Sequence, residues 1–91
     1  MTALRRTLPI VNQRGLHARA SRKLAELALA YEAVIRVRRE DEEVDATSLM
    51  DLMMLGAGLG SEIEVSAEGP QAGEALDAIA RLVADKFGEG E

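Results

Sequence analysis

His17 is the only histidine in the sequence and the residue best suited to carry chemistry. It lies in Gly15-Leu16-His17-Ala18-Arg19, where a loop is expected to meet the start of a helix. The first N–H groups of a helix have no partners within it, and that end carries about half a positive charge. An imidazole there is a nucleophile beside a site for anions, and Arg19 is placed to contact phosphate oxygens. The pattern therefore predicts a histidine that holds a phosphoryl group.

Other interpretations of His17 are open from the residues alone. An isolated histidine at a helix start is often no more than a capping residue, although Gly15, Arg14 and Arg19 around it favour phosphoryl chemistry. A metal site is implausible, because one histidine without cysteine cannot supply the usual ligands. We expect no metal and no cofactor. Arg14 either adds a second cation near the phosphate or points to solvent.

The composition describes a single small domain over residues 1–91, with 47% apolar and only 2% aromatic residues. The absence of cysteine excludes disulfides and thiol chemistry and suits a reducing cytoplasm. Residues 1–6 hold no apolar segment typical of a signal peptide, and no apolar run approaches membrane-spanning length. We therefore expect a cytoplasmic monomer that does not enter a membrane.

The net charge of −5, with so few aromatic residues, argues against nucleic-acid binding. Positive charge is nevertheless concentrated in the first quarter of the chain, whereas the last third is mostly acidic. This asymmetry indicates one face that receives an acidic partner or an anion, although solvation of the surface is enough to explain any single charge. The cations concerned are Arg5, Arg6, Arg14, Arg19, Arg22 and Lys23.

Hydrophobic periodicity predicts elements in the order strand, helix, strand, strand, helix, strand, helix. They span 7–11, 18–31, 33–38, 43–46, 48–56 and 62–68, and a last helix begins at Gly69-Pro70, with Pro70 in its first turn. Strands with one polar face indicate an α+β fold, an open-faced antiparallel sheet covered by helices on one side. Pro9 cannot donate a ladder hydrogen bond, which places the first strand at a sheet edge.

The last helix should bury one apolar stripe and then stop at Gly88. Residues 88–91 are expected to form a frayed tail. The stripe consists of Leu76, Ile79, Ala80, Val83 and Phe87.

The helix over 48–56 is apolar nearly all round, yet so short a helix at a domain edge cannot bury every face. Leu52 and Leu55 are expected to face the core. The other apolar side chains then form an exposed patch near His17, of the kind that marks protein interfaces, and methionine suits a surface with several partners. The alternative is that all of them are core. This methionine patch consists of Leu49, Met50, Met53 and Met54.

Ser48 precedes this helix, and Asp51 stands three residues later, which is the form of a capping box. The serine is either an N-cap alone or also a site of phosphorylation, which would place negative charge beside the methionine patch. The basic face of the first helix around Arg22 and Lys23 is the next surface for partner docking.

The motif around His17 closely resembles the active-site motif of HPr, the family of histidine phosphocarriers of the sugar phosphotransferase system. The segment 48–56 is similar to the family's second helix, headed by its regulatory serine. Gly69-Pro70-Gln71 and Glu74-Ala75-Leu76 resemble the start of its third helix, particularly in the nitrogen-related branch, NPr. The resemblance covers nearly the whole chain and implies the HPr open-faced sandwich with sheet order one-four-two-three. That order agrees with the edge position inferred from Pro9.

The resemblance implies that His17 accepts on Nδ1 a phosphoryl group from an enzyme I-type protein, which takes it from phosphoenolpyruvate, and passes it to a IIA-type protein. Arg19 matches the family's phosphate-contacting arginine, and Ser48 matches the serine modified by HPr kinase/phosphorylase. Two positions depart from the family: Ala20 stands where proline is usual, and Arg14 where a small polar or apolar residue is usual. Alanine suits a helix interior better than proline, so Ala20 should not disturb the helix.

The main interpretation is a phosphocarrier that is not itself an enzyme. Two other functions stay open. One is a regulatory binding module in which phosphorylation of His17 or Ser48 only switches partner affinity. The other is a small α+β adaptor with a structural histidine. Sugar uptake and nitrogen or potassium signalling are both open as the output of a carrier.

Overall fold

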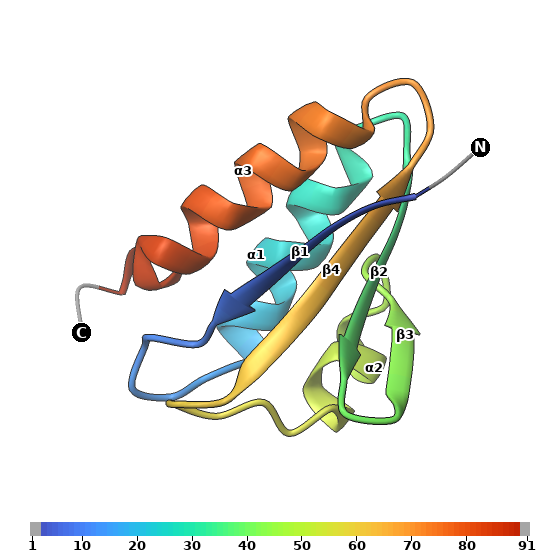
Figure 1. The fold of residues 1–91 in the computed structure, drawn as a ribbon. Coiled ribbons are helices and arrows are strands. Elements are labelled where there is room, and N and C mark those ends of the chain that lie inside the picture. The colour runs from blue at the N-terminus through green and yellow to red at the C-terminus, as the bar shows by residue number, and fades with distance from the viewer. Residues whose placement is uncertain (1–2, 90–91) are drawn as a thin grey trace.

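The computed structural model describes residues 3–89 and contains a four-stranded antiparallel sheet. Its strands are β1 (Leu4–Pro9), β2 (Val34–Arg39), β3 (Glu42–Asp45) and β4 (Glu62–Glu68). They lie in the order β1-β4-β2-β3, so that β1, which ends at Pro9, forms one edge (Figure 1). This arrangement confirms the predicted fold class, sheet order and edge strand.

Three α-helices cover one face of the sheet (Figure 1). α1 (Ala18–Leu29) packs against both α3 (Ala72–Ala84) and α2 (Leu49–Met54), and a short 3₁₀ helix, η1 (Lys86–Gly88), follows α3. The other face of the sheet is polar and open to solvent. On it, Glu64 Oε1 lies 3.2 Å from Arg38 Nη2 and 3.5 Å from Arg5 Nη1.

The core lies between the sheet and the helices and is built almost entirely from aliphatic side chains. Alternate residues of β4, namely Ile63, Val65 and Ala67, are buried, and Val65 pairs with buried Val37 of β2. Leu24 of α1 is fully buried above them. Removing each large aliphatic side chain of this kind from water contributes about 1.5–3 kcal/mol. The alternation seen in the sequence thus decides which face of the sheet the helices cover.

β1 begins and ends earlier than the predicted range 7–11. It pairs with β4 along its whole length, from the Leu4–Ala67 pair onward. Ile10 lies beyond the strand but is buried, and its N–H donates to the Ser61 carbonyl at 2.8 Å. The bounds differ because pairing with β4 sets them, and local alternation carries no information about that partner.

α3 begins at Ala72, so the predicted start at Gly69-Pro70 is wrong. Gly69 has a φ of 134°, which no helix accommodates, and Pro70 lies in the turn that follows. Gln71 ties this turn to the loop after α1, because its N–H donates to the Glu32 carbonyl at 3.0 Å and its Oε1 accepts from Glu32 N at 2.8 Å. These long-range hydrogen bonds hold the chain in a turn and delay the helix.

α3 ends at Ala84, so the predicted end of this helix at Gly88 is wrong, and Phe87 lies beyond α3 in η1. Phe87 is fully buried although its φ of 55° is not helical. The predicted stripe is therefore buried as expected, but across a change of backbone direction. Its remaining members Leu76, Ile79 and Val83 are buried and Ala80 is half-buried.

Leu52 of α2 is fully buried, so Leu52→Ala should lower the free energy of unfolding by roughly 2–5 kcal/mol. Met54, in the same helix, is 74% exposed, and the control Met54→Ala should change stability by less than about 0.5 kcal/mol. Urea unfolding followed by circular dichroism measures both. Equal losses would contradict the separation of α2 into a buried and an exposed side.

Candidate functional site

His17 occupies the N-cap position of α1, with an extended backbone (φ −72°, ψ −178°). Its carbonyl accepts a helical hydrogen bond from Ser21 N at 2.9 Å, whereas its side chain makes no capping hydrogen bond. The side chain is 22% exposed. The predicted place at the junction of loop and helix is confirmed, and the ring stays available for other contacts.

The loop before His17 is held against the turn that follows α2. Leu16 N donates to the Ala57 carbonyl at 2.9 Å, and Ser21 Oγ donates to the Leu16 carbonyl at 2.9 Å. Gly15 has a φ of 61°, and a Cβ there would lie 2.3 Å from Ala57 O and 2.7 Å from Gly58 Cα. Only glycine allows the two backbones to come this close. This close contact between the backbone at Gly15 and the backbone at Ala57 fixes the position at which α1 starts.

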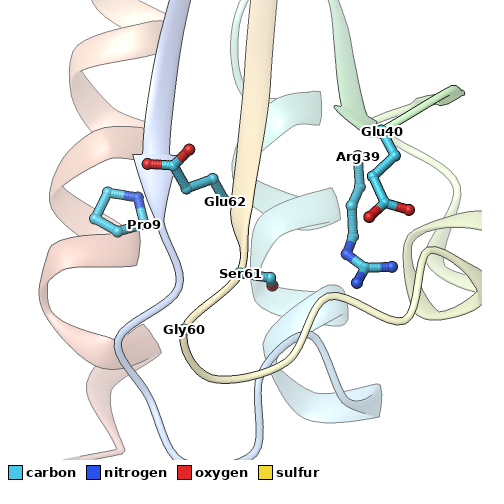
Figure 2. A pocket seen from close by; sticks show the side chains of 6 residues that line it. All are labelled: Pro9, Arg39, Glu40, Gly60, Ser61 and Glu62. Carbon is cyan, nitrogen blue, oxygen red and sulfur yellow. The ribbon is translucent and has the colours of Figure 1, made fainter.

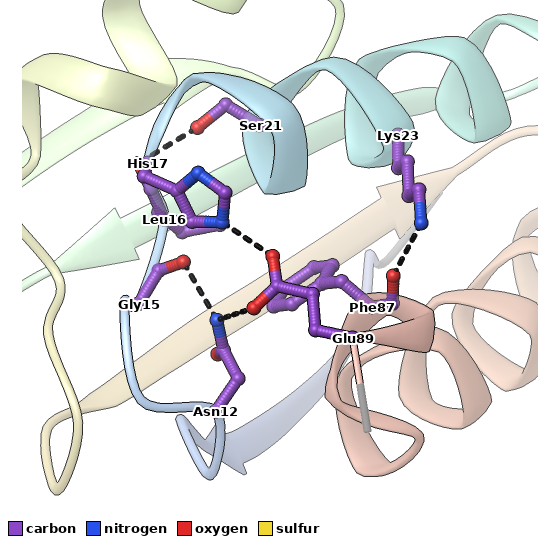
Figure 3. Close-up of polar contacts among 8 residues, drawn as sticks. All are labelled: Asn12, Gly15, Leu16, His17, Ser21, Lys23, Phe87 and Glu89. Carbon is purple, nitrogen blue, oxygen red and sulfur yellow. Dashed lines mark hydrogen bonds and ion pairs between the residues drawn. The ribbon is translucent and has the colours of Figure 1, made fainter. Parts of the chain in front are cut away.

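Asn12 and Glu89 complete the surroundings of His17 (Figure 3). Buried Asn12 donates through Nδ2 to the Gly15 carbonyl at 2.9 Å and to Glu89 Oε1 at 3.2 Å. The other oxygen of Glu89, Oε2, is hydrogen-bonded to His17 Nε2. The expected frayed tail thus packs on the domain at Gly88 and Glu89, and its residues 90–91 lie outside the described part of the chain.

The environment of Glu89 favours its ionised form. The hydrogen bond to His17 lowers the pKa of Glu89, partial burial opposes this, and the hydrogen bond from Asn12 and the charge of Arg14 lower it further. Neither Asn12 nor Glu89 is predicted from the sequence as a site residue. Asn12 carried a weak signal as a polar residue directly after an apolar strand, but Glu89 carried none, since it lies in a Gly-Glu-Gly-Glu tail.

Three cations from the first part of the chain gather beside this cluster. Arg14, Arg19 and Lys23 line a cavity of about 200 Å³, together with Gly88 and Glu89. Lys23 Nζ donates to the Phe87 carbonyl at 2.6 Å, which ties α1 to η1 (Figure 3). Arg14 and Arg19 form no ion pair within residues 3–89. The cavity therefore combines positive charge with room for a small anion.

Arg22 and Lys23 are predicted from the sequence to share one docking surface, but in the structure their side chains lie apart. Arg22 does not line the cavity: it lies exposed on α1 and pairs with Glu26 at 3.2 Å, one helical turn away. Lys23 is half-buried and faces the cavity. Neighbours in a helix sequence point in directions about 100° apart, which accounts for the difference.

The methionine patch is exposed as predicted. Met50 is 69% and Met54 74% exposed, whereas Leu52 and Leu55 are buried. Ser48 is the N-cap of α2, and its Oγ accepts from Asp51 N at 3.3 Å. Because α2 packs on α1 and its following turn binds Leu16, the patch lies next to the histidine site. The remaining members of the patch, Leu49 and Met53, are exposed to a smaller extent.

A larger cavity of about 490 Å³ lies at the end of the sheet, and His17 is not among the residues that line it (Figure 2). Its lining contains no histidine and no cluster of like charge, since it combines the cation of Arg39 with the carboxylates of Glu40 and Glu62. Arg39 also donates to the Leu55 carbonyl at 3.2 Å and so supports the end of α2. We take the smaller cavity beside His17 as the functional one because of its chemistry. The rest of the larger lining is Pro9, Gly60 and Ser61.

Comparison with known proteins gives one consistent result. Residues 4–85 match the family model described as PTS HPr component phosphorylation site. The phosphocarrier protein HPr of Cupriavidus necator is 47% identical over 88 residues, which cover 97% of this chain and 99% of that protein. The phosphocarrier protein NPr of Shewanella violacea is 44% identical over 89 residues, 98% of each. The crystal structure of HPr from Thermoanaerobacter tengcongensis is 36% identical, covers 98% of both chains and superposes with a TM-score of 0.89.

An open-faced sandwich with a lone histidine at a helix start and cations beside it defines a small phosphocarrier. The chain belongs to the HPr family of phosphocarrier proteins of the phosphotransferase system. Relatives named NPr support the NPr-like branch indicated by the start of the third helix. Within residues 3–89, no helix combines the length and the apolar composition that crossing a bilayer requires.

Gly15→Ala should destabilise the protein by about 1–3 kcal/mol, because alanine is strained at positive φ and would collide with the backbone at Ala57. Gly58→Ala is the matched control, since a Cβ there meets nothing within 4 Å. Thermal unfolding measures both variants. If Gly15→Ala proved as stable as Gly58→Ala, the close approach of the two loops would not be what places His17.

Proposed function

We propose that His17 accepts a phosphoryl group on Nδ1 from an enzyme I-type protein charged by phosphoenolpyruvate, and passes it to a IIA-type protein. The observation that carries the proposal is the position of the only histidine, at the N-cap of α1 and beside the cavity lined by Arg14, Arg19 and Lys23. We expect this chain to act in the cytoplasm as a monomer, since its sequence contains no cysteine and no membrane-spanning apolar run.

Electrostatics support a phosphohistidine at this place. A phosphoryl group adds about −1.5 to −2 charges, which the start of α1 and nearby cations can stabilise. Arg19 is the residue that we assign to phosphate contact during transfer, because it lines the cavity and follows His17 in the first turn of α1. Arg14 lines the same cavity and is the second candidate. The protein is a carrier and not an enzyme in the usual sense.

We infer that partner proteins dock on the methionine patch, with the cationic rim of α1 around Lys23 beside it. Exposed methionines adapt to different surfaces, which suits a carrier that meets a donor and an acceptor in turn. Ser48 lies at the rim of the patch as the N-cap of α2. Phosphorylation there by an HPr kinase/phosphorylase would add negative charge to this docking surface and weaken it. Arg22 lies farther round α1 and contributes at most to the edge of the interface.

A second function is favoured by the similarity to proteins named NPr. The chain would then act as a regulatory module, in which phosphorylation of His17 or Ser48 switches its affinity for a partner. Two measurements distinguish these functions: phosphoryl transfer from this chain to a IIA-type protein, and the binding of a partner by the phosphorylated and the unphosphorylated chain. A switch without onward transfer would favour the regulatory one.

His17→Ala should abolish phosphorylation and leave the fold intact, because no other histidine can accept the group. The measurement is intact mass after incubation with enzyme I and phosphoenolpyruvate. The modification of the wild type should be lost in acid and persist in alkali, as expected of a phosphoramidate. A modified His17→Ala variant, or an acid-stable modification in this relay, would overturn the assignment.

Met50→Glu should weaken binding to the N-terminal domain of an enzyme I at least tenfold, with a stability change below about 0.5 kcal/mol. The reason is that a charge would enter the centre of an apolar contact. Leu29→Glu is the matched control, since Leu29 and Met50 are both 69% exposed but lie on different helices. A binding titration and thermal melts test both. Equal affinity of the two variants would place the docking surface elsewhere.

A further inference from the structure

Glu89 reaches His17 from the end of the described chain. Its Oε2 is hydrogen-bonded to His17 Nε2, while its Oε1 accepts from Asn12 Nδ2 at 3.2 Å (Figure 3). Only 9% of the Glu89 side chain is exposed. Two oxygens of one carboxylate are thus held by two groups of the site, which leaves the side chain little freedom.

The residues around Glu89 hold it in this position. Asn12 is fully buried and is itself fixed by its bond to the Gly15 carbonyl at 2.9 Å. The backbone before Glu89 is anchored by the buried Phe87 ring and by Lys23, which donates to the Phe87 carbonyl. The contact to His17 is therefore prepared by the fold.

The chemistry of the contact determines where the ring proton lies. An ionised carboxylate only accepts hydrogen bonds, and the lowered pKa of Glu89 keeps it ionised at neutral pH. His17 Nε2 must then carry the proton. In the neutral ring this leaves the lone pair on Nδ1, which points away from Glu89 (Figure 3).

We propose that Glu89 is a positioning residue for phosphoryl transfer, which holds the His17 ring in the tautomer and orientation that make Nδ1 the nucleophile. The inference rests on the proposed function, since it concerns the same phosphoryl acceptor. Glu89 touches only Nε2 and takes no part in bonding to phosphorus.

The step balances without a proton leaving the site. The Nδ1 lone pair forms the bond to phosphorus while the bond between phosphorus and the donor protein breaks, and that electron pair stays on the donor. The ring keeps its Nε2 proton and gains a positive charge, which the Glu89 carboxylate neutralises. Transfer to the acceptor protein reverses these changes. The repulsion between the Glu89 carboxylate and the phosphoryl group is offset by three cations that line a cavity together with Glu89, namely Arg14, Arg19 and Lys23.

The test compares Glu89→Ala, Glu89→Gln and the control Glu68→Ala, which removes an exposed carboxylate from the end of β4. Nitrogen-15 NMR of the His17 ring reports which nitrogen is protonated and needs no partner protein. At a pH at which the ring is neutral, wild type and Glu68→Ala should show protonated Nε2 and unprotonated Nδ1. Glu89→Ala should show both nitrogens averaged between tautomers, and its phosphorylation by enzyme I should slow about tenfold. Glu89→Gln, which keeps an accepting oxygen without charge, should retain the tautomer and recover part of the rate.

Wild-type ring shifts together with a wild-type phosphorylation rate in Glu89→Ala would overturn the positioning role. Faster phosphorylation of Glu89→Ala would also overturn it, because it would show that Glu89 hinders the transfer. Thermal melts exclude loss of fold as the cause of slow transfer, and rescue by Glu89→Gln distinguishes positioning from packing. If the wild type accepts no phosphate from enzyme I, the proposed function fails, while the ring shifts still decide whether Glu89 sets the tautomer.

Discussion

The close approach of two loops, at Gly15 and at Ala57, is the constraint on which the site depends. The missing side chain of Gly15 lets Leu16 N bind the Ala57 carbonyl, and this contact sets where α1 begins. It therefore places His17 at the exposed end of the helix. The same contact brings the turn after α2, and with it the methionine patch, next to the histidine. One backbone contact thus joins the chemical site to the surface on which we expect partners to dock.

A carrier must hold a phosphoryl group and also release it, and the charges around His17 would suit both needs if His17 is the acceptor, as we propose. The protein has a net charge of −5, yet Arg14, Arg19 and Lys23 share one small cavity. Cations at a solvent-exposed surface are screened, so they stabilise a phosphate moderately and do not trap it. Glu89 adds a carboxylate to the same cavity and lowers the net attraction further. A partner that excludes water on docking would strengthen these interactions at the moment of transfer.

Much of the fold and the position of His17 could be predicted from the sequence, because these features depend on local chemistry. Alternation of apolar residues decided the buried face of the sheet, and Pro9 decided its edge strand, because both depend on single residues and their nearest neighbours. The place of His17 at a helix start followed from Gly15 before it and the helical periodicity after it. The exposure of the methionine patch followed from size, since a helix as short as α2 has only one side to bury.

The features that depend on contacts between residues distant in the sequence were decided by the tertiary structure alone. The start of α3 is delayed by hydrogen bonds between Gln71 and Glu32. Arg22 and Lys23 lie in different surroundings because the Lys23 side chain reaches η1, whereas Arg22 pairs with Glu26 on the exposed side of α1. The contact of Glu89 with His17 joins residues that are 72 positions apart. A glutamate between glycines has no local pattern that marks it. Only folding brings this carboxylate to the imidazole, because the burial of Phe87 turns the end of the chain back onto α1.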